Sequence, residues 1–152
     1  MATVTKARVR YEDDLFAWTQ EQAALLRAHA TGAIDWENLA EEIESMGGRD
    51  RRELKSRLAV ILLRLLKWQA QPALRGSSWR KSLRTQRRKI RDLLTQSPSL
   101  RREVPDLMRE VYADAVKDAI DETGLRADSF PSACPYASDD VLDEDFLPAT
   151  DL

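Results

Sequence analysis

Apolar side chains recur with helical spacing through the middle of the chain. Between residues 54 and 68 they follow steps of four, three, four and three, at Leu54, Leu58, Ile61, Leu65 and Trp68. Such steps place side chains on one face of an α-helix. Other aliphatic residues in this segment widen the apolar surface beyond one stripe. A helix over residues 49–69 is therefore predicted, and it should be the most buried element of the fold.

Four other segments show helical spacing of apolar residues, and none shows the alternation that is typical of a strand. These segments are 14–29, 35–46, 78–94 and 97–122. A chain of 152 residues is long enough for one hydrophobic core and one domain. We therefore expect an all-α fold, a single helical bundle of five or six helices with an extended C-terminal strap.

Residues with known preferences for helix ends set the expected boundaries. Asp35 is placed to cap the helix over 35–46 with its side chain, and Gly47-Gly48 is expected to end that helix. Pro105 is expected to kink or restart the helix over 97–122. Gly124 suits a helix end in the left-handed conformation.

The tryptophans each lie on one of the apolar stripes, at positions Trp18, Trp36, Trp68 and Trp79. Helical spacing of this kind predicts that they pack in the core. A groove for a partner or ligand is the alternative, because tryptophan is enriched at binding hot spots.

The two ends of the chain differ from the expected bundle, residues 11–127. Residues 1–10 carry charge and no apolar segment, so a flexible N-terminus is predicted and a signal peptide is not. Residues 128–152 hold three prolines, which forbid a long helix. Apolar residues spaced by acids predict an acidic strap that packs on the bundle, with one helical turn opening at Ser138.

Two observations bear on the compartment. The longest apolar run, residues 58–63, is far shorter than the roughly 20 residues that a membrane-spanning helix needs. A single cysteine, Cys134, excludes an internal disulfide and fits a reducing compartment. We therefore expect a cytoplasmic protein with no membrane partner.

Charge is unevenly distributed along the chain. The 38 residues between Glu53 and Asp92 hold twelve bases and no acid, whereas residues 1–53 hold eleven acids and seven bases. Residues 103–152 hold fourteen acids and three bases. The net charge of −2 thus conceals a basic middle segment between acidic flanks. Such a segment can bind phosphate groups, or it can pair with acids of the same chain.

Pairing within the chain predicts a specific register. A basic stripe on the helix over 78–94 and an acidic stripe on the next helix face each other if the chain turns back near Gln96. The expected pairs, in register to within one residue, are Arg91–Glu103, Arg87–Asp106, Arg84–Glu110 and Arg80–Asp114. Exposed pairs contribute only about 0.2–1 kcal/mol each. The network would therefore set the orientation of the two helices more than their stability.

Seven bases of the middle segment have no obvious acidic partner in this scheme. They are the candidate nucleic-acid-binding residues: Arg57, Arg64, Lys67, Arg75, Lys81, Arg88 and Lys89. Lysine and arginine neutralise phosphates and release counterions. Against this hypothesis, the chain is acidic overall and contains no known nucleic-acid-reading motif.

No arrangement of residue types indicates catalysis or metal binding. The chain has one histidine, His29, and the residue three before it is Leu26, so the Glu-x-x-His pair of carboxylate metal sites is missing. Glu37, Glu41 and Glu44 share one helix face, for which a solvated acidic surface is the simpler interpretation. We predict no catalytic residue, no metal ligand and no cofactor.

Several sequence blocks resemble a bacterial family, domain of unknown function family 29. They include Tyr11-Glu12-Asp13-Asp14, Asn38-Leu39-Ala40-Glu41-Glu42-Ile43-Glu44-Ser45-Met46-Gly47, Leu65-Leu66-Lys67-Trp68-Gln69, Ser78-Trp79-Arg80 and Cys134-Pro135-Tyr136. The resemblance covers residues 11–148. It implies an all-α fold in a prokaryotic protein, and it brings no activity, cofactor or catalytic residue to this chain. Pro105 departs from the family pattern.

These observations favour a small, non-enzymatic cytoplasmic protein that acts through macromolecular contacts. The partner would be an unknown protein or a second copy of the chain in an oligomer. Nucleic-acid binding through the basic helices over 49–69 and 78–94 is the first alternative. An enzyme with a carboxylate-based site in the bundle is the second.

Overall fold

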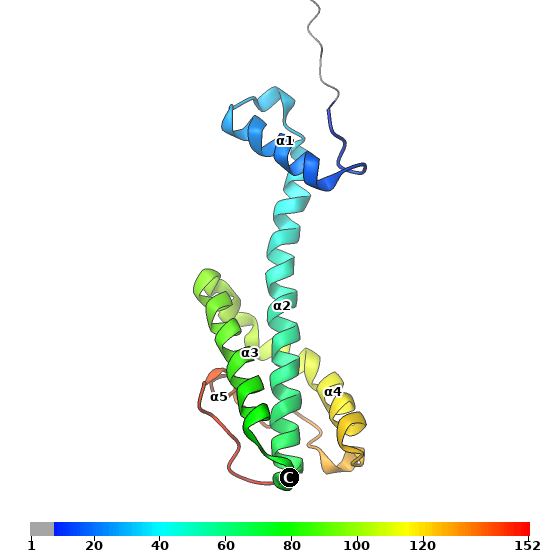
Figure 1. The fold of residues 1–152 in the computed structure, drawn as a ribbon, viewed down its shortest axis with the longest axis vertical. Coiled ribbons are helices and arrows are strands. Elements are labelled where there is room, and N and C mark those ends of the chain that lie inside the picture. Colours follow the sequence, from blue (N-terminus) through cyan, green and yellow to red (C-terminus); the bar gives the residue numbers. More distant parts are fainter. Residues whose placement is uncertain (1–7) are drawn as a thin grey trace, which may run out of the picture. The chain divides into compact units, whose positions relative to one another are not determined.

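The computed structural model describes residues 8–152, so the flexibility expected for residues 1–7 lies outside the described residues. The described chain contains five α-helices and no strand, which confirms the all-α prediction (Figure 1). The helices are α1 (Leu15–Arg27), α2 (Trp36–Ala70), α3 (Ser77–Gln96), α4 (Val104–Thr123) and α5 (Ser138–Leu142). Short 3-10 segments connect them, at Thr31–Ala33, Pro72–Leu74, Pro98–Glu103 and Ala127–Ser129.

Helix α2 corrects the prediction that Gly47-Gly48 ends a helix. It runs without a break through both glycines, so the expected helices over 35–46 and 49–69 are one element. Glycine costs about 1 kcal/mol relative to alanine in a helix interior, which weakens a helix without forbidding it. Good helix formers on both sides, such as Met46 and Arg49, offset this cost. Contacts nevertheless divide the chain at this point, into compact units of residues 1–48 and 49–152.

In the first unit, α1 is held to the start of α2 by polar contacts. The Asp14 side chain accepts a hydrogen bond from the Ala17 N–H and caps α1. The Trp18 Nε1 donates to the Asp35 carboxylate at 3.2 Å, and the Asp35 N–H donates to Gln22 Oε1 at 2.8 Å. Trp18 is buried, so its prediction as a core residue is confirmed.

Two expectations for the first unit are wrong. Helix α1 ends at Arg27 instead of His29, because His29 adopts a left-handed conformation with φ of 54°. Trp36 is exposed instead of packed in the core. Its indole N–H donates to the Thr31 carbonyl at 3.2 Å, which keeps the ring on the outside of the 3-10 turn.

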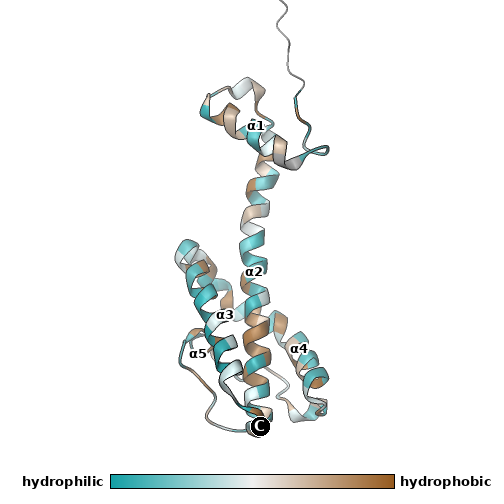
Figure 2. Cartoon of the chain, in the orientation of Figure 1, coloured by the Kyte–Doolittle hydropathy of each residue, from teal (hydrophilic) through white to brown (hydrophobic). Residues whose placement is uncertain are grey.

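In the second unit, the C-terminal half of α2 is the central element. Its apolar side chains are almost fully buried, as predicted: Leu54, Leu58, Ile61, Leu62, Leu65 and Leu66. Figure 2 shows this part of α2 as its most hydrophobic stretch. Helices α3 and α4 lie on either side of it (Figure 1). Arg57 of α2 donates to Gln86 of α3 at 3.0 Å, which supplies the partner that a polar residue on the inner face of α3 requires.

The segment between α3 and α4 is a 3-10 turn that leads into the first turn of α4. Six residues, Pro98–Glu103, form a 3-10 segment, and α4 starts at Val104 with Pro105 in its first turn. The prediction that Pro105 restarts the helix is confirmed. Gly124 ends α4 with φ of 72°, the left-handed conformation expected there.

The segment after α4 packs on the second unit. Phe130, Tyr136 and Val141 are buried in the same core as α2. The Tyr136 hydroxyl donates to the Gln69 side chain, and Gln69 Nε2 donates to the Thr150 carbonyl at 2.7 Å. The expected helical turn at Ser138 is present as α5. This is the strap, residues 128–152.

Candidate nucleic-acid interface

The basic stripe of α3 does not pair with the acidic stripe of α4, so the predicted register is wrong. Arg91 pairs with Glu144 of the strap at 2.9 Å. Two of the predicted acidic partners pair with α2 instead: Glu103 lies 2.6 Å from Arg51, and Glu110 lies 3.1 Å from Lys55. The reason is the packing order: α2 separates α3 from α4, so each helix pairs with a different neighbour (Figure 1).

The other two predicted acidic partners make contacts inside α4. Asp106 pairs with Arg109, and Asp114 pairs with Lys117 at 3.7 Å. Both contacts join residues three positions apart on an exposed helix surface, where an ion pair contributes little.

Arg87 is withdrawn from the surface altogether. It is 3% exposed, and its guanidinium donates to the carbonyls of Val141 at 2.9 Å and Phe146 at 2.8 Å. Burial lowers its pKa, and the nearby carboxylates of Asp143, Asp145 and Glu144 oppose that shift. Arg87 therefore holds the strap and is not available to a ligand.

Five of the seven candidate bases have partners in the described structure. Lys67 pairs with Glu122 at 2.6 Å and lies 5.0 Å from the centre of the Trp79 ring. The other four contacts are Arg57 with Glu53, Arg64 with Glu122, Arg75 with Asp151, and Arg88 with Glu144 at a long 3.9 Å. Within residues 8–152, Lys81 and Lys89 are the two candidates for which the structure shows no ion pair.

A groove runs along the outer face of α3 and contains no acid. Its volume is about 720 Å³, and it is lined by Ser77, Ser78, Arg80, Lys81, Arg84, Thr85 and Arg88. We call it the basic groove. Its four bases and three hydroxyl groups all come from one helix, because steps of three and four residues bring them to one face. Arg80 and Arg84 were expected to be paired internally, and the structure shows no ion pair for either within residues 8–152.

The sequence contained a signal for the basic groove. Positions 77, 81, 84 and 88 follow steps of four, three and four and include no apolar residue. This pattern marks a solvent-facing stripe opposite the apolar positions of the same helix. A second stripe, of opposite charge and further along the chain, favoured pairing within the chain, which the described part of the structure does not show for Arg80 and Arg84.

The groove offers phosphate several kinds of hydrogen-bond donor. Guanidinium groups bind phosphate oxygens in a planar fork, and an ammonium group acts as a point charge. The groove also includes the N-terminus of α3, where Gly76 makes no side-chain cap. First-turn N–H groups and the positive end of the helix dipole favour an anion there. From Ser77 to Arg88 the stripe extends about 16 Å along the helix.

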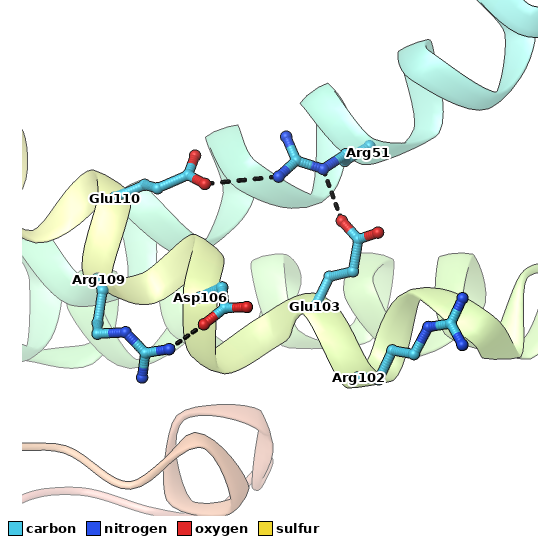
Figure 3. A pocket seen from close by; sticks show the side chains of 6 residues that line it. All are labelled: Arg51, Arg102, Glu103, Asp106, Arg109 and Glu110. Atoms are coloured by element: carbon cyan, nitrogen blue, oxygen red, sulfur yellow. Dashed lines mark hydrogen bonds and ion pairs between the residues drawn. The ribbon is translucent and has the colours of Figure 1, made fainter.

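A groove between α2 and α4 shows the contrast. It is lined by Arg51, Arg102, Glu103, Asp106, Arg109 and Glu110, three bases and three acids (Figure 3). Arg51 bridges Glu103 and Glu110 in this groove, and Asp106 contacts Arg109. The Lys55 hydrogen bond and the charges of Lys55 and Arg51 lower the pKa of Glu110. These charges already satisfy one another, so this groove holds little surplus charge for a ligand.

The described structure gives no sign of a metal centre. Among residues 8–152, no three histidine, cysteine, aspartate or glutamate side chains come together as metal ligands would. In the same part of the chain, every helix is too short or too polar to cross a membrane.

One comparison with known proteins gives a match. A family model described as "Domain of unknown function DUF29" matches residues 10–147. No curated protein and no solved structure matches the chain.

Proposed function

The chain belongs to the DUF29 family, a domain of unknown function, and we propose that it is a non-enzymatic protein that binds the phosphate backbone of nucleic acid through the basic groove of α3. The observation that carries this proposal is the groove itself, in which four bases are gathered and no acid is present. Most other bases of the middle segment pair with Glu53, Glu122, Glu144 or Asp151. The positive charge that these pairs leave unneutralised therefore lies mainly in the groove.

The mode of binding follows from the shape of the surface. The groove residues stand on the exposed side of a helix that is packed on its other side by the core. Electrostatic contacts of this kind depend on the positions of the phosphates and not on the base sequence. The expected affinity is that of non-specific binding, with a dissociation constant of about 10⁻⁴–10⁻⁶ M at physiological salt.

The acidic strap limits the groove on one side. Glu144 lies 3.9 Å from Arg88 and 2.9 Å from Arg91. A nucleic acid that follows α3 would therefore contact Arg80, Lys81 and Arg84 more closely than Arg88.

The test is fluorescence anisotropy of a labelled, mixed-sequence DNA or RNA strand at several salt concentrations. Neutralising three phosphates gives a slope of about −2 to −3 in a plot of log affinity against log salt. The triple variant R80Q/K81Q/R84Q should lose most of this slope and most of the binding at low salt.

The matched control is R109Q/K117Q/R126Q, which removes the same charge from exposed positions of α4 and the turn after it. It should bind nearly as tightly as the unmodified protein. Absence of binding at low salt would refute the proposal. An equal loss in both triple variants would show that net charge, and not the basic groove, governs binding.

A further inference from the structure

The N-terminal part of α2 exposes three large apolar side chains on the surface of the first unit. Trp36 is 57% exposed, Ile43 is 61% exposed and Met46 is 58% exposed. They follow one another by seven and three residues, so they form one stripe along the helix. Among the residues of the first unit whose burial the structure describes, the buried apolar side chains are Trp18 and Ile34. A clustered apolar stripe on so small a core marks an interaction surface.

Helix α1 does not cover this stripe, and helical geometry shows why. Two polar contacts fix the position of α1 here: Trp18 of α1 donates to Asp35, the residue before α2, and Tyr11, which precedes α1, donates to Glu42 of α2 at 2.6 Å. Asp35 and Glu42 are seven residues apart and lie on one side of the helix. Trp36 and Ile43 directly follow them, so they point about 100° further round, away from α1. Met46 lies one turn beyond Glu42 on the same side of the helix, and its 58% exposure shows that α1 does not cover it.

The charged residues of the first unit from Asp35 onward are all negative. The 21 residues between Arg27 and Arg49 contain five acids and neither lysine nor arginine. Glu37 and Glu44 follow Trp36 and Ile43 by one residue and border the stripe on the side away from α1, with Glu41 beyond them. Within residues 8–152, the structure shows no ion pair for these three glutamates, in contrast to the bases of the second unit. We call Trp36, Ile43 and Met46 with Glu37, Glu41 and Glu44 the acidic–apolar face.

We propose that the acidic–apolar face binds a basic amphipathic helix of a partner protein. Apolar side chains of that helix would cover Trp36, Ile43 and Met46, and its lysines or arginines would pair with the unpartnered glutamates. An amphipathic helix is recognised in this way by anchors about one and two turns apart. The stripe covers eleven residues, from Trp36 to Met46, and is about 15 Å long, which matches roughly three turns of a bound helix.

Two small residues on the same side of α2 support a helical partner. Ala40 and Gly47 are exposed and lie between the apolar side chains and the bordering acids. A Cβ atom added at Gly47 would meet no atom within 4 Å. Small residues at such positions let a second helix approach the backbone closely.

Charge decides against a second copy of the chain as the occupant. Two acidic–apolar faces pressed together would bring six glutamates into one interface, and like charges across an interface are destabilising. A basic partner replaces this repulsion with attraction. Nucleic acid is repelled from this face for the same reason, so the proposal is independent of the function proposed for the basic groove.

The test uses the full chain and a synthetic 18-residue peptide that places leucine on one helical face and lysine elsewhere. Two further peptides serve as comparisons: a scrambled sequence of the same composition, and a version with glutamate in place of lysine. Isothermal titration calorimetry should show binding of the leucine–lysine peptide and at least tenfold weaker binding of the other two.

Variants then locate the site. I43S/M46S should weaken binding of the leucine–lysine peptide at least tenfold, and its circular dichroism should be unchanged because both side chains are exposed. E37K/E41K/E44K should transfer the preference to the leucine–glutamate peptide. The control D114K/D118K/D121K makes the same charge change on α4 and should bind the leucine–lysine peptide as the unmodified protein does.

Three outcomes would overturn the proposal. One is equal binding of the leucine–lysine peptide and its scrambled form, and another is equal loss in the α2 and α4 charge variants. The third is a dimer in sedimentation velocity that I43S/M46S dissociates, without binding of the peptide, because this would assign the acidic–apolar face to a second copy.

Discussion

Replacing Arg87 with methionine should release the strap from α3. Methionine keeps an unbranched apolar stem and removes the donors that bind the carbonyls of Val141 and Phe146 at 2.9 Å and 2.8 Å. Hydrogen bonds from a charged donor contribute about 1.5–3 kcal/mol each, so two such bonds amount to roughly 3–6 kcal/mol.

Part of this stabilisation is offset in the native protein. The guanidinium is buried, its Nη2 has no hydrogen-bond partner, and burial lowers the pKa of Arg87. Removing a buried charge returns some of that desolvation cost. We therefore expect R87M to destabilise the strap by a net of about 2–4 kcal/mol.

The measurement is amide hydrogen exchange, which reports opening of the strap separately from unfolding of each unit. In R87M, protection should fall about 30-fold or more at α5 and at Phe146, since 1.4 kcal/mol is a factor of ten. R91M is the matched control, because Arg91 is exposed and its pair with Glu144 is worth about 1 kcal/mol or less. If R87M and R91M change strap protection equally, the carbonyl contacts of Arg87 do not hold the strap and the reasoning is refuted.

Two further predictions concern α2 and its N-terminal cap. G47A should stabilise α2 by up to about 1 kcal/mol, because alanine is the better helix former and the space at Gly47 is open; a neutral or negative change in thermal unfolding would show that the helix is interrupted there. Hydrogen bonds from Asn38 and Trp18 lower the pKa of Asp35 below its ordinary value of 3.8. The stability from this carboxylate is therefore present above pH 3.8 and is lost as the pH falls through the lower folded-state pKa. The Trp18 indole N–H resonance should shift in that acid range, and D35N should abolish the dependence; a shift that persists in D35N would assign the titration to another group.

The sequence predicts the helices well where local chemistry decides them. The spacing of Leu54, Leu58 and Ile61 identifies the buried part of α2, and Pro105 and Gly124 mark the two ends of α4. These signals act over a few residues, so they do not depend on how the rest of the chain packs. Gly47-Gly48 misleads because a glycine pair only weakens a helix, and its neighbours determine whether the helix continues.

The ion pairs could not be predicted because they depend on which helices are neighbours. The register between Arg84 and Glu110 was consistent along the sequence, yet it assumed a direct hairpin of α3 and α4. In the structure Glu110 pairs with Lys55 and Arg51, and the partner of Lys67 is Glu122, 55 residues away. Separations of this size leave no pattern in a single sequence. The basic groove therefore depends on two things: its own bases, and the pairing of the chain's acids with bases outside it.

The contacts of the strap also have a consequence for the order of folding during synthesis. The hydrogen bond from Gln69 to the Thr150 carbonyl joins residues 81 positions apart, and that from Arg87 to Val141 joins residues 54 apart. A ribosome adds about 5–20 residues per second, so Thr150 is synthesised roughly 4–16 s after Gln69. During this interval the apolar side of α2 lacks the cover that Tyr136 and Val141 later supply. A nascent chain halted before residue 136 should therefore expose a surface that chaperones bind, and this surface should disappear once the strap has been made.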